Sequence, residues 1–276
     1  MEKSQDRLDV LERIKLCEKN EQWDVDVEID PPAYELFAKD VDYLNKKISS
    51  KIATWFANKI ATNFFEKLIK NGQFIIKEVK GLENFLAIKD KGAIITSNHF
   101  SPLENYAVWR TIKPHINGKR LYRVIKEGNY TNPPAPFKLI MRHCDTLPLS
   151  RNRETMKNFL KAVDILLRRG EKILVYPEQA MWWNYRKPRP LKNGAFKFAV
   201  SSNVPVIPFF ITMTDSNTLG ADGFPIQEYT VNIMPAIFPD PKLSKNKNAE
   251  MIKNKNYELW KQCYEDFYGK KLTYEK

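Results

Sequence analysis

The sequence predicts an α/β fold in which a mostly parallel central sheet is flanked by helices and preceded by an N-terminal helical segment. Short apolar runs of strand length alternate along the chain with segments whose apolar residues recur every three or four positions. The length also fits, because 276 residues can bury a large core. We expect an N-terminal helical segment over residues 1–72 and an α/β domain over residues 73–276.

The N-terminal segment is expected to be helical over residues 5–20 and again from residue 33 to about residue 70, with a break near Ser49-Ser50. Between the two helices, residues 23–30 alternate apolar side chains with acids. This alternation predicts an extended piece, closed by Pro31-Pro32. Its acidic face is expected to be solvated.

In the α/β domain, buried or alternating apolar runs predict strands, and three- or four-residue spacing predicts helices. Strands are expected at residues 73–80, 93–97, 121–126, 145–150, 172–176, 204–212 and 229–237. Helices are expected at 102–112, 137–141, 153–169, 193–202 and 249–268, and loops at 132–136 and 219–225. Helices between strands act as crossovers, and crossovers favour parallel strand pairing.

The apolar stripe of residues 52–69 is rich in Trp and Phe, with lysines off the stripe. A basic amphipathic helix of this kind can lie in a membrane interface with its apolar face among the acyl chains. The same stripe can instead pack on the sheet. The sequence leaves both interpretations open.

Charge and composition limit the partners. Lys and Arg number 45 against 33 Asp and Glu, a net charge of +12, so anionic partners such as phospholipid headgroups, a phosphorylated thioester carrier or nucleic acid are expected. The three cysteines are too widely spaced to match a metal-binding motif. Such a low cysteine content is typical of proteins in a reducing compartment. The sequence has no recognisable secretory signal and no apolar run near the ~20 residues of a membrane span. We therefore expect a cytoplasmic protein that contacts the cytoplasmic membrane face peripherally.

The strongest candidate site follows the apolar run 93–96. Ser101 as N-cap, Pro102 at the first helical position and Glu104 three residues after the cap predict a helix start, which places His99 at a strand-to-helix corner. In open α/β sheets this edge binds substrates. Glu104 can orient the imidazole of His99 as a general base. Alternatively, Glu104 only completes a capping box and His99 is a polar turn residue.

Asn98-His99, with four residues before Glu104, resembles the NHxxxxD box of the glycerophospholipid acyltransferases. This PlsC-like family acylates glycerol 3-phosphate and lysophosphatidic acid. Other blocks resemble the family's in the same order, over roughly residues 75–240. They are Val79–Asn84 with Gly92–Ile95, Leu147–Arg151, Val175–Glu178 (the start of "FPEGTR"), Lys192–Phe196 and Val204–Pro208.

The resemblance implies the glycerolipid acyltransferase fold and acyl transfer from an acyl thioester, acyl-CoA or acyl carrier protein, to a lipid hydroxyl. His99 is then the base and Glu104 its partner. Arg151 suits phosphate recognition, because its planar fork grips two oxygens at once. The residues expected to bind substrate are Asn98, Ser101, Lys126, Arg151, Glu178, Arg186 and Lys192.

The sequence departs from the family where "GTR" is expected, since Gln179-Ala180-Met181 stands there, followed by Trp182 and Trp183. Met181 cannot bind a phosphate as the family's Arg is thought to do. One explanation is that a cation of the longer loop, Arg186, Arg189 or Lys192, binds the acceptor's phosphate instead. The other is that the acceptor carries a different headgroup, which stacks on one of the tryptophans. Glu104 replaces the usual Asp and is longer by one methylene.

The expected reaction uses no metal and no cofactor besides the acyl-CoA or acyl carrier protein co-substrate, with backbone amides after His99 as oxyanion donors. Two other functions compete with it. One is a basic membrane- or nucleic-acid-binding protein that kept the fold and lost catalysis, and the other is a thioesterase that uses water. Nucleic acid is not expected as a partner, because aromatic and basic residues are not interleaved on one strand platform.

Overall fold

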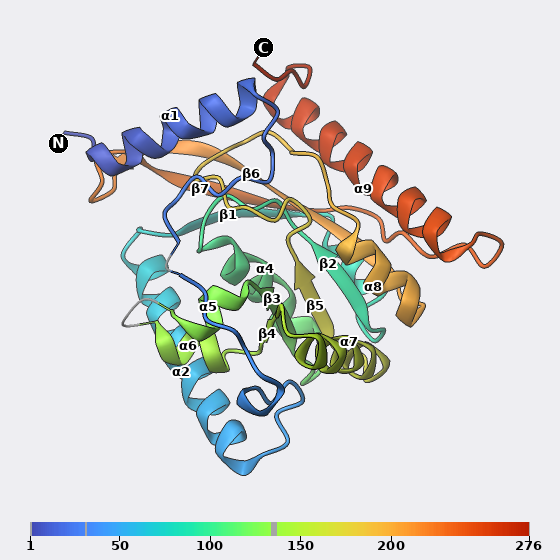
Figure 1. Ribbon diagram of the computed structural model, residues 1–276. Coiled ribbons are helices and arrows are strands. Elements are labelled where there is room, and N and C mark those ends of the chain that lie inside the picture. The colour runs from blue at the N-terminus through green and yellow to red at the C-terminus, as the bar shows by residue number, and fades with distance from the viewer. Residues whose placement is uncertain (1, 31, 134–136, 276) are drawn as a thin grey trace.

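The computed structural model describes residues 2–30, 32–133 and 137–275. Its elements, in chain order, are α1 (Gln5–Lys19), η1 (Ala38–Asp40), α2 (Ile48–Lys70), β1 (Ile75–Lys80), α3 (Leu82–Leu86), β2 (Ala93–Thr96), α4 (Glu104–Ile112), η2 (Lys113–His115), β3 (Leu121–Ile125), α5 (Glu127–Thr131), α6 (Lys138–His143), β4 (Thr146–Pro148), α7 (Arg153–Arg168), β5 (Lys172–Val175), α8 (Gly194–Ser202), β6 (Val206–Leu219), β7 (Pro225–Ile233) and α9 (Lys245–Tyr268). Figure 1 shows their arrangement.

The strands form one sheet in the order β1-β7-β6-β2-β5-β3-β4. Every neighbouring pair is parallel except β6 and β7, which form an antiparallel hairpin. The predicted α/β fold with a mostly parallel sheet is confirmed. β2 lies between β5 and β6, with Ile95 paired to Leu174 on one side and to Ile207 on the other.

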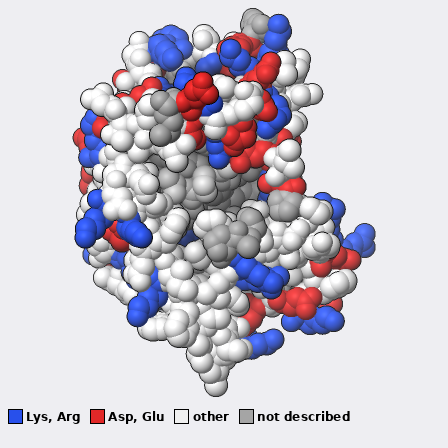
Figure 2. Space-filling model, turned by 90° about the vertical axis from the view of Figure 1, so that its left-hand side faces the viewer, with Lys and Arg blue, Asp and Glu red and all other residues white. Residues whose placement is uncertain are grey.

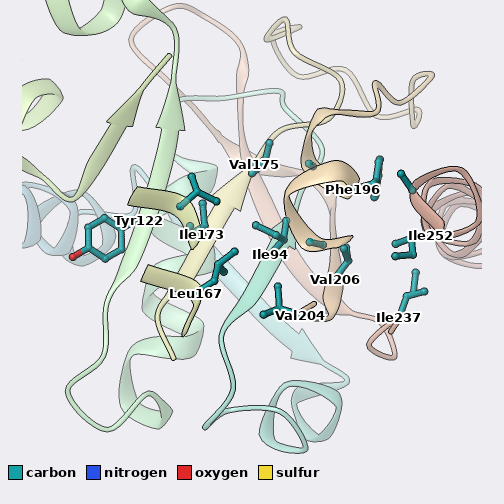
Figure 3. Close-up of a cluster of buried hydrophobic side chains, with 14 of the residues drawn as sticks. Ile94, Tyr122, Leu167, Ile173, Val175, Phe196, Val204, Val206, Ile237 and Ile252 are labelled. Atoms are coloured by element: carbon teal, nitrogen blue, oxygen red, sulfur yellow. The ribbon is translucent and has the colours of Figure 1, made fainter. Parts of the chain in front are cut away.

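Helices cover both faces of the sheet, which explains why β2 and β5 are buried along their whole length. Successive side chains of a strand point to opposite faces. Ile94 and Ile173 therefore belong to a cluster beneath α7, α8 and α9, whereas Ile95 and Leu174 face α4 and the last turns of α2. Figure 3 shows part of the first cluster, between the sheet and the helices α8 and α9.

The turn between β1 and α3 explains one of the sequence blocks. Gly81 has φ +72°, and a Cβ there would meet the carbonyl oxygen of Ile233 at 2.1 Å, so this position requires glycine. Asn84 donates a hydrogen bond to the same carbonyl oxygen at 2.9 Å. The block 79–84 thus joins the turn to the end of β7.

The expected helix over residues 33–47 is wrong, because this stretch is irregular apart from η1 and α2 begins only at Ile48. Groups from distant parts of the sequence bind this stretch. The amide of Leu36 donates to Glu127 Oε1 at 2.9 Å, and the carbonyl of Leu36 accepts from Thr155 Oγ1 at 2.8 Å. The Tyr43 hydroxyl donates to the carbonyl of Pro148 at 2.8 Å. Pro31 and residues 134–136 of the predicted loops lie outside the described residues.

The β6–β7 hairpin is longer than the sequence suggests. β6 continues to Leu219 and β7 already begins at Pro225, because cross-strand pairing continues almost to the turn. In the described ranges, none of the helices combines the length and apolar character needed to cross a bilayer.

Candidate functional site

Four adjacent parallel strands end at one edge of the sheet and present the predicted site residues there. His99 follows β2, Glu178 follows β5, Lys126 follows β3 and Arg151 follows β4. Neighbouring strands lie about 4.8 Å apart, so these four strand ends span about 14 Å. The sequence expectation that the Glu178 turn lies beside the His99 turn is confirmed by the pairing of β2 with β5.

His99 and Glu104 are in direct contact, since His99 Nδ1 and Glu104 Oε1 share a short hydrogen bond. The His99 side chain is 21% exposed, whereas that of Glu104 is fully buried. A carboxylate on Nδ1 assigns the ring proton to that nitrogen and leaves Nε2 as the acceptor. The pair thus has the geometry of an oriented general base.

Glu104 also closes the turn that follows His99. Its Oε2 accepts hydrogen bonds from the amides of Phe100 at 2.8 Å and Ser101 at 2.5 Å. Glu104 is therefore both the partner of His99 and a capping residue, because one carboxylate oxygen binds the imidazole and the other accepts from the amides of the turn. The helix itself begins at Glu104 and not after Ser101, since residues 101–103 form a separate turn in which Ser101 Oγ accepts from the amide of Leu103 at 3.1 Å.

The expected oxyanion donors are engaged elsewhere. The amides of Phe100 and Ser101 donate to Glu104, and the amide of His99 donates to Glu178 Oε2 at 3.0 Å. Pro102 has no amide hydrogen. Main-chain groups of residues 99–102 therefore cannot stabilise an oxyanion without breaking these bonds.

Burial sets the electrostatics of the pair. Burial raises the pKa of the Glu104 carboxyl, and the bonds from His99 and the two amides oppose that shift. The Tyr176 ring stacks on the imidazole of His99 with centroids 3.9 Å apart and planes at 10°. Burial, followed by the nearby charge of Glu104, raises the pKa of the Tyr176 hydroxyl, which has no hydrogen-bond partner among the described residues.

A buried ion pair fixes the main chain of His99. Glu178 Oε1 accepts from the amide of Arg189 at 2.8 Å, and Arg189 Nη2 donates to Glu178 Oε2 at 3.0 Å. The same Nη2 donates to the carbonyl of His99 at 3.4 Å. The side chain of Arg189 is fully buried, and its guanidinium lies over the Trp182 ring at 4.5 Å. In this structure Glu178 and Arg189 position His99.

Asn98 and Ser101, both expected to bind substrate, are adjacent to His99 but engaged internally. The Asn98 amide donates to the carbonyl of Ile211 at 3.0 Å and accepts from its amide at 2.8 Å, which ties the end of β2 to β6. A contact of either residue with substrate stays a prediction.

The four predicted substrate-binding cations differ in their surroundings. Lys126 pairs with Asp26 and, at 3.1 Å, with Asp30, and Lys192 pairs with Asp24 at 2.9 Å. The guanidinium of Arg186 donates to Asp215 at 2.6 Å, on the part of β6 that extends beyond β2. The Arg151 side chain is 86% exposed and meets Glu127 at 3.8 Å.

The departure from the family's "GTR" block has a structural counterpart. Gln179, where the family has Gly, adopts a left-handed conformation with φ +67°. Trp182 is fully buried and Trp183 is 9% exposed, and both pack on α1 with Val27 and Phe224. The interpretation that either tryptophan stacks on a headgroup is wrong, because neither ring is open to a ligand.

Sequence reasoning missed two neighbours of the site. The acidic face of residues 23–30 is not simply solvated, since its aspartates pair with Lys126 and Lys192. Tyr176 was also missed, although its place directly after β5, the neighbour of β2, was a usable signal.

Comparison with known proteins concerns the family and the fold. A family model described as Acyltransferase matches residues 77–212. A relative from Schizosaccharomyces pombe, described as an uncharacterized acyltransferase, is 31% identical over 126 residues, which are 45% of this chain and 43% of the relative. The chain thus aligns with less than half of that relative's length.

A solved structure extends the agreement to the fold. The 1-acyl-sn-glycerophosphate acyltransferase PlsC from Thermotoga maritima superposes with a TM-score of 0.54 at 20% identity, covering 84% of this chain and 87% of that one. At this identity the likeness concerns the fold alone. Taken with the family model, it leads to one conclusion: residues 77–212 form a domain of the acyltransferase family, within a chain that has a PlsC-like fold.

Proposed function

We propose that this protein transfers a fatty acyl group from an acyl thioester to a hydroxyl of a glycerophospholipid-type acceptor. Lysophosphatidic acid is the acceptor that the family resemblance implies, and a lipid with another headgroup is the alternative. The observation that carries the proposal is the partly exposed imidazole of His99, held by a buried carboxylate at the carboxyl edge of the sheet.

In the proposed reaction, Nε2 of His99 takes the proton of the acceptor hydroxyl while the hydroxyl oxygen attacks the thioester carbonyl carbon. The tetrahedral intermediate then collapses, the carbon–sulfur bond breaks, and the leaving thiolate takes the proton back from the imidazolium. Glu104 holds the ring and stabilises its cationic form. A base of this kind typically contributes about 10²- to 10⁴-fold to the rate.

The donor in this proposal is acyl-CoA or an acyl carrier protein, which serves as co-substrate, and no other cofactor is required. The basic excess of +12 suits either phosphorylated carrier. The phosphate of the donor or acceptor has a ready partner in the exposed guanidinium of Arg151.

We further propose peripheral binding to the cytoplasmic face of a membrane through α2. The two halves of α2 differ in their surroundings. Near its end Phe65 packs on the core, stacked on Tyr106 with centroids 4.4 Å apart. Its earlier turns expose large apolar side chains, namely Ile48, Ile52, Trp55, Phe56, Ile60 and Phe64. The lower end of the molecule in Figure 2, where α2 begins, is largely free of charged side chains.

Such a surface favours a lipid interface, because aromatic and aliphatic side chains at helical spacing enter the acyl region and flanking lysines meet anionic headgroups. Lys51 and Lys59 are exposed beside the stripe. A lipid acceptor has to be drawn from a bilayer, so a docking helix also fits the proposed chemistry.

The test is acylation of a panel of lyso-acceptors in liposomes by purified protein with acyl-CoA or acyl carrier protein donors, read by mass spectrometry of the lipids. We expect one acylated product from the wild type and a loss of about 10²- to 10⁴-fold for His99→Ala. His115→Ala, a histidine outside the site, is the matched control. Unchanged acylation by His99→Ala contradicts the proposed base. Free fatty acid without acylated lipid indicates a thioesterase, and no turnover of any acceptor favours a binding protein.

A further inference from the structure

Arg123, on β3, is a buried cation without a counter-ion. The residue is 9% exposed, and no carboxylate of the described residues pairs with its guanidinium. Its Nε donates to Asn105 Oδ1 at 3.1 Å, and its Nη1 donates to the carbonyls of Leu121 and Cys144, each at 3.2 Å. A charge that leaves water is costly unless an opposite charge meets it. The burial of Arg123 is therefore only partly compensated by these neutral acceptors.

The other buried charged side chains of the described residues are compensated. Most of them meet an opposite charge, namely Glu18, Glu104, Glu127, Glu178 and Arg189. Lys172 lacks a carboxylate, but its Nζ uses all three donors on the carbonyls of Lys89, Lys91 and Gly170. Burial lowers the pKa of Lys172 to about 8, so this lysine can also shed its charge. An arginine in a protein cannot.

One nitrogen of Arg123 is left for a ligand. Nη2 makes no hydrogen bond with the described residues, although it is not among the unpartnered atoms that are completely shielded from solvent. The carboxylates next to its partners are engaged with other cations, Glu104 with His99, Glu66 with Arg110 and Asp145 with Arg120. An anion that reaches Nη2 can form a charge-assisted hydrogen bond without displacing any of these contacts.

Arg123 lies on the same face of the sheet as the ring that stacks on the proposed base. It pairs with Leu174 of β5, whose side chain faces α4. Tyr176, two residues after Leu174 on that face, begins about 7 Å further along the strand, and its ring stacks on His99. Burial raises the pKa of the Tyr176 hydroxyl, and the charge of Arg123 opposes this rise. The guanidinium is thus close to the site but a step away from the imidazole.

The headgroup of a glycerophospholipid suits this separation. Two carbons and one ester oxygen lie between its phosphate and the hydroxyl that takes the acyl group, so a hydroxyl at His99 Nε2 leaves the phosphate some way from the imidazole. Arg123 has such a place, since Asn105, which its Nε binds, directly follows Glu104. The oxyanion of the reaction forms beside Nε2 itself and suits this guanidinium less well.

We propose that Arg123 binds the phosphate of the acceptor through Nη2 while His99 takes the proton of the acceptor's hydroxyl. The proposal rests on the proposed acyltransferase function, and it leaves Arg151, which follows the edge strand β4, to the phosphates of the donor. The buried charge of Arg123 is then fully compensated only when the acceptor is bound.

The first experiment measures binding without turnover. Glycerol 3-phosphate is titrated into the full chain, and phosphorus NMR gives its Kd. Arg123→Gln keeps a donor for the two carbonyls but removes the charge, so we expect the Kd to rise by about tenfold or more. Arg110→Met is the matched control, because this arginine is 45% exposed and already paired with Glu66. It should change the Kd by less than about twofold.

Two measurements distinguish a binding role of Arg123 from a structural one. Without ligand, Arg123→Gln should unfold at the wild-type temperature or above it, because a charge without a counter-ion is removed. A lower unfolding temperature together with an unchanged Kd would show a structural arginine and overturn the proposal. Arg123→Lys, which keeps the charge but not the planar fork, should bind glycerol 3-phosphate with an intermediate Kd. It also serves as the test variant if Arg123→Gln does not fold.

The second experiment identifies the phosphate by steady-state kinetics in vesicles. Lysophosphatidic acid and a monoacylglycerol, which lacks the phosphate, are compared as acceptors with acyl-CoA as donor. Arg123→Gln should raise KM for lysophosphatidic acid by about tenfold or more and keep kcat within about threefold. The KM values for monoacylglycerol and acyl-CoA should change by less than about twofold. A rise in the KM for acyl-CoA alone would assign the phosphate to the donor and overturn the proposal.

The outcomes also separate this proposal from the function on which it rests. If the wild type acylates neither acceptor yet binds glycerol 3-phosphate through Arg123, the acyltransferase function fails and the phosphate site stands. If acylation occurs but Arg123→Gln binds glycerol 3-phosphate as tightly as the wild type, only the phosphate site is overturned. An equal loss of kcat on both acceptors overturns it as well, because Arg123 would then act on the reacting atoms and not on the headgroup.

Discussion

Glu178 and Arg189 form a buried ion pair, with Oε2 and Nη2 3.0 Å apart, and both residues also hold the main chain of His99. Arg189→Met leaves the Glu178 carboxylate buried and unpaired, so we expect a loss of about 3–5 kcal/mol in the free energy of unfolding. Urea denaturation measures it. Arg186→Met, which breaks the partly exposed pair with Asp215, is the control and should cost less than about 1 kcal/mol. Equal costs for the two variants would contradict the structural role of the buried pair.

Acid should stop the proposed acyl transfer through the His99–Glu104 pair. Burial raises the pKa of Glu104, so its carboxylate takes up a proton at a higher pH than a solvated glutamate does. Protonation of Glu104 removes the acceptor for His99 Nδ1–H, so the carboxyl no longer orients the imidazole or stabilises its cationic form. The initial rate of acyl transfer should therefore fall as the pH is lowered, and rise again when the pH is restored.

Glu104→Gln should lower kcat by about 10²- to 10⁴-fold at every pH. Activity within tenfold of the wild type would refute the orienting role.

Tyr176 is expected to act through its ring and not through its hydroxyl. The ring stacks on His99, while the shielded hydroxyl lacks a partner among the described residues. Tyr176→Phe keeps the stack and removes an unsatisfied polar group, so stability should be unchanged or rise by up to about 1 kcal/mol, with kcat retained. Thermal unfolding and steady-state rates check this. A fall in kcat beyond tenfold would show that the hydroxyl takes part in the reaction.

Gln179→Gly should stabilise the protein. Gln179 has φ +67°, a conformation that costs a residue with a side chain about 1–2 kcal/mol, and glycine's larger loss of chain entropy offsets part of the gain. We expect a net rise of about 0.5–1 kcal/mol in the free energy of unfolding, measured with denaturant. Gln179→Ala is the matched control, because it shortens the side chain but keeps the strained backbone. A gain with Ala as large as that with Gly would contradict the backbone explanation.

Vesicle binding should depend on the exposed turns of α2. Trp55 and Phe56 are 58% and 50% exposed, so Trp55→Ser/Phe56→Ser removes apolar surface without opening the core. We expect the partition coefficient for anionic vesicles, measured by sedimentation, to fall by about tenfold or more. Leu160→Ser removes a 46% exposed apolar residue from α7 and should leave binding unchanged. If both variants bind equally well, α2 is not the docking element.

The parts of this structure that the sequence predicted are those that depend on local pattern. The apolar runs located β2 and β5, and the spacing from His99 and Ser101 to Glu104 anticipated both contacts of that glutamate. These signals lie within a few residues of one another. Periodicity and capping chemistry can therefore be read without knowledge of the fold.

The parts that the sequence did not predict depend on partners far along the chain. Residues 33–47 resemble a helix in pattern, yet Leu36 bonds to Glu127, 91 positions away. The pairing of Lys126 with Asp26 joins residues 100 positions apart. The alternation of residues 23–30 predicted an extended piece but not the cations that it would meet, because those contacts exist only after the sheet has assembled.

The arrangement of the four strand ends also affects how such a protein can change over evolution. His99, Glu178, Lys126 and Arg151 each follow a different strand of the same rigid sheet. A loop after one strand can therefore lengthen or exchange residues while the other three keep their places. The connections can thus be remodelled one at a time, while the corner that holds the His99–Glu104 pair is inherited intact.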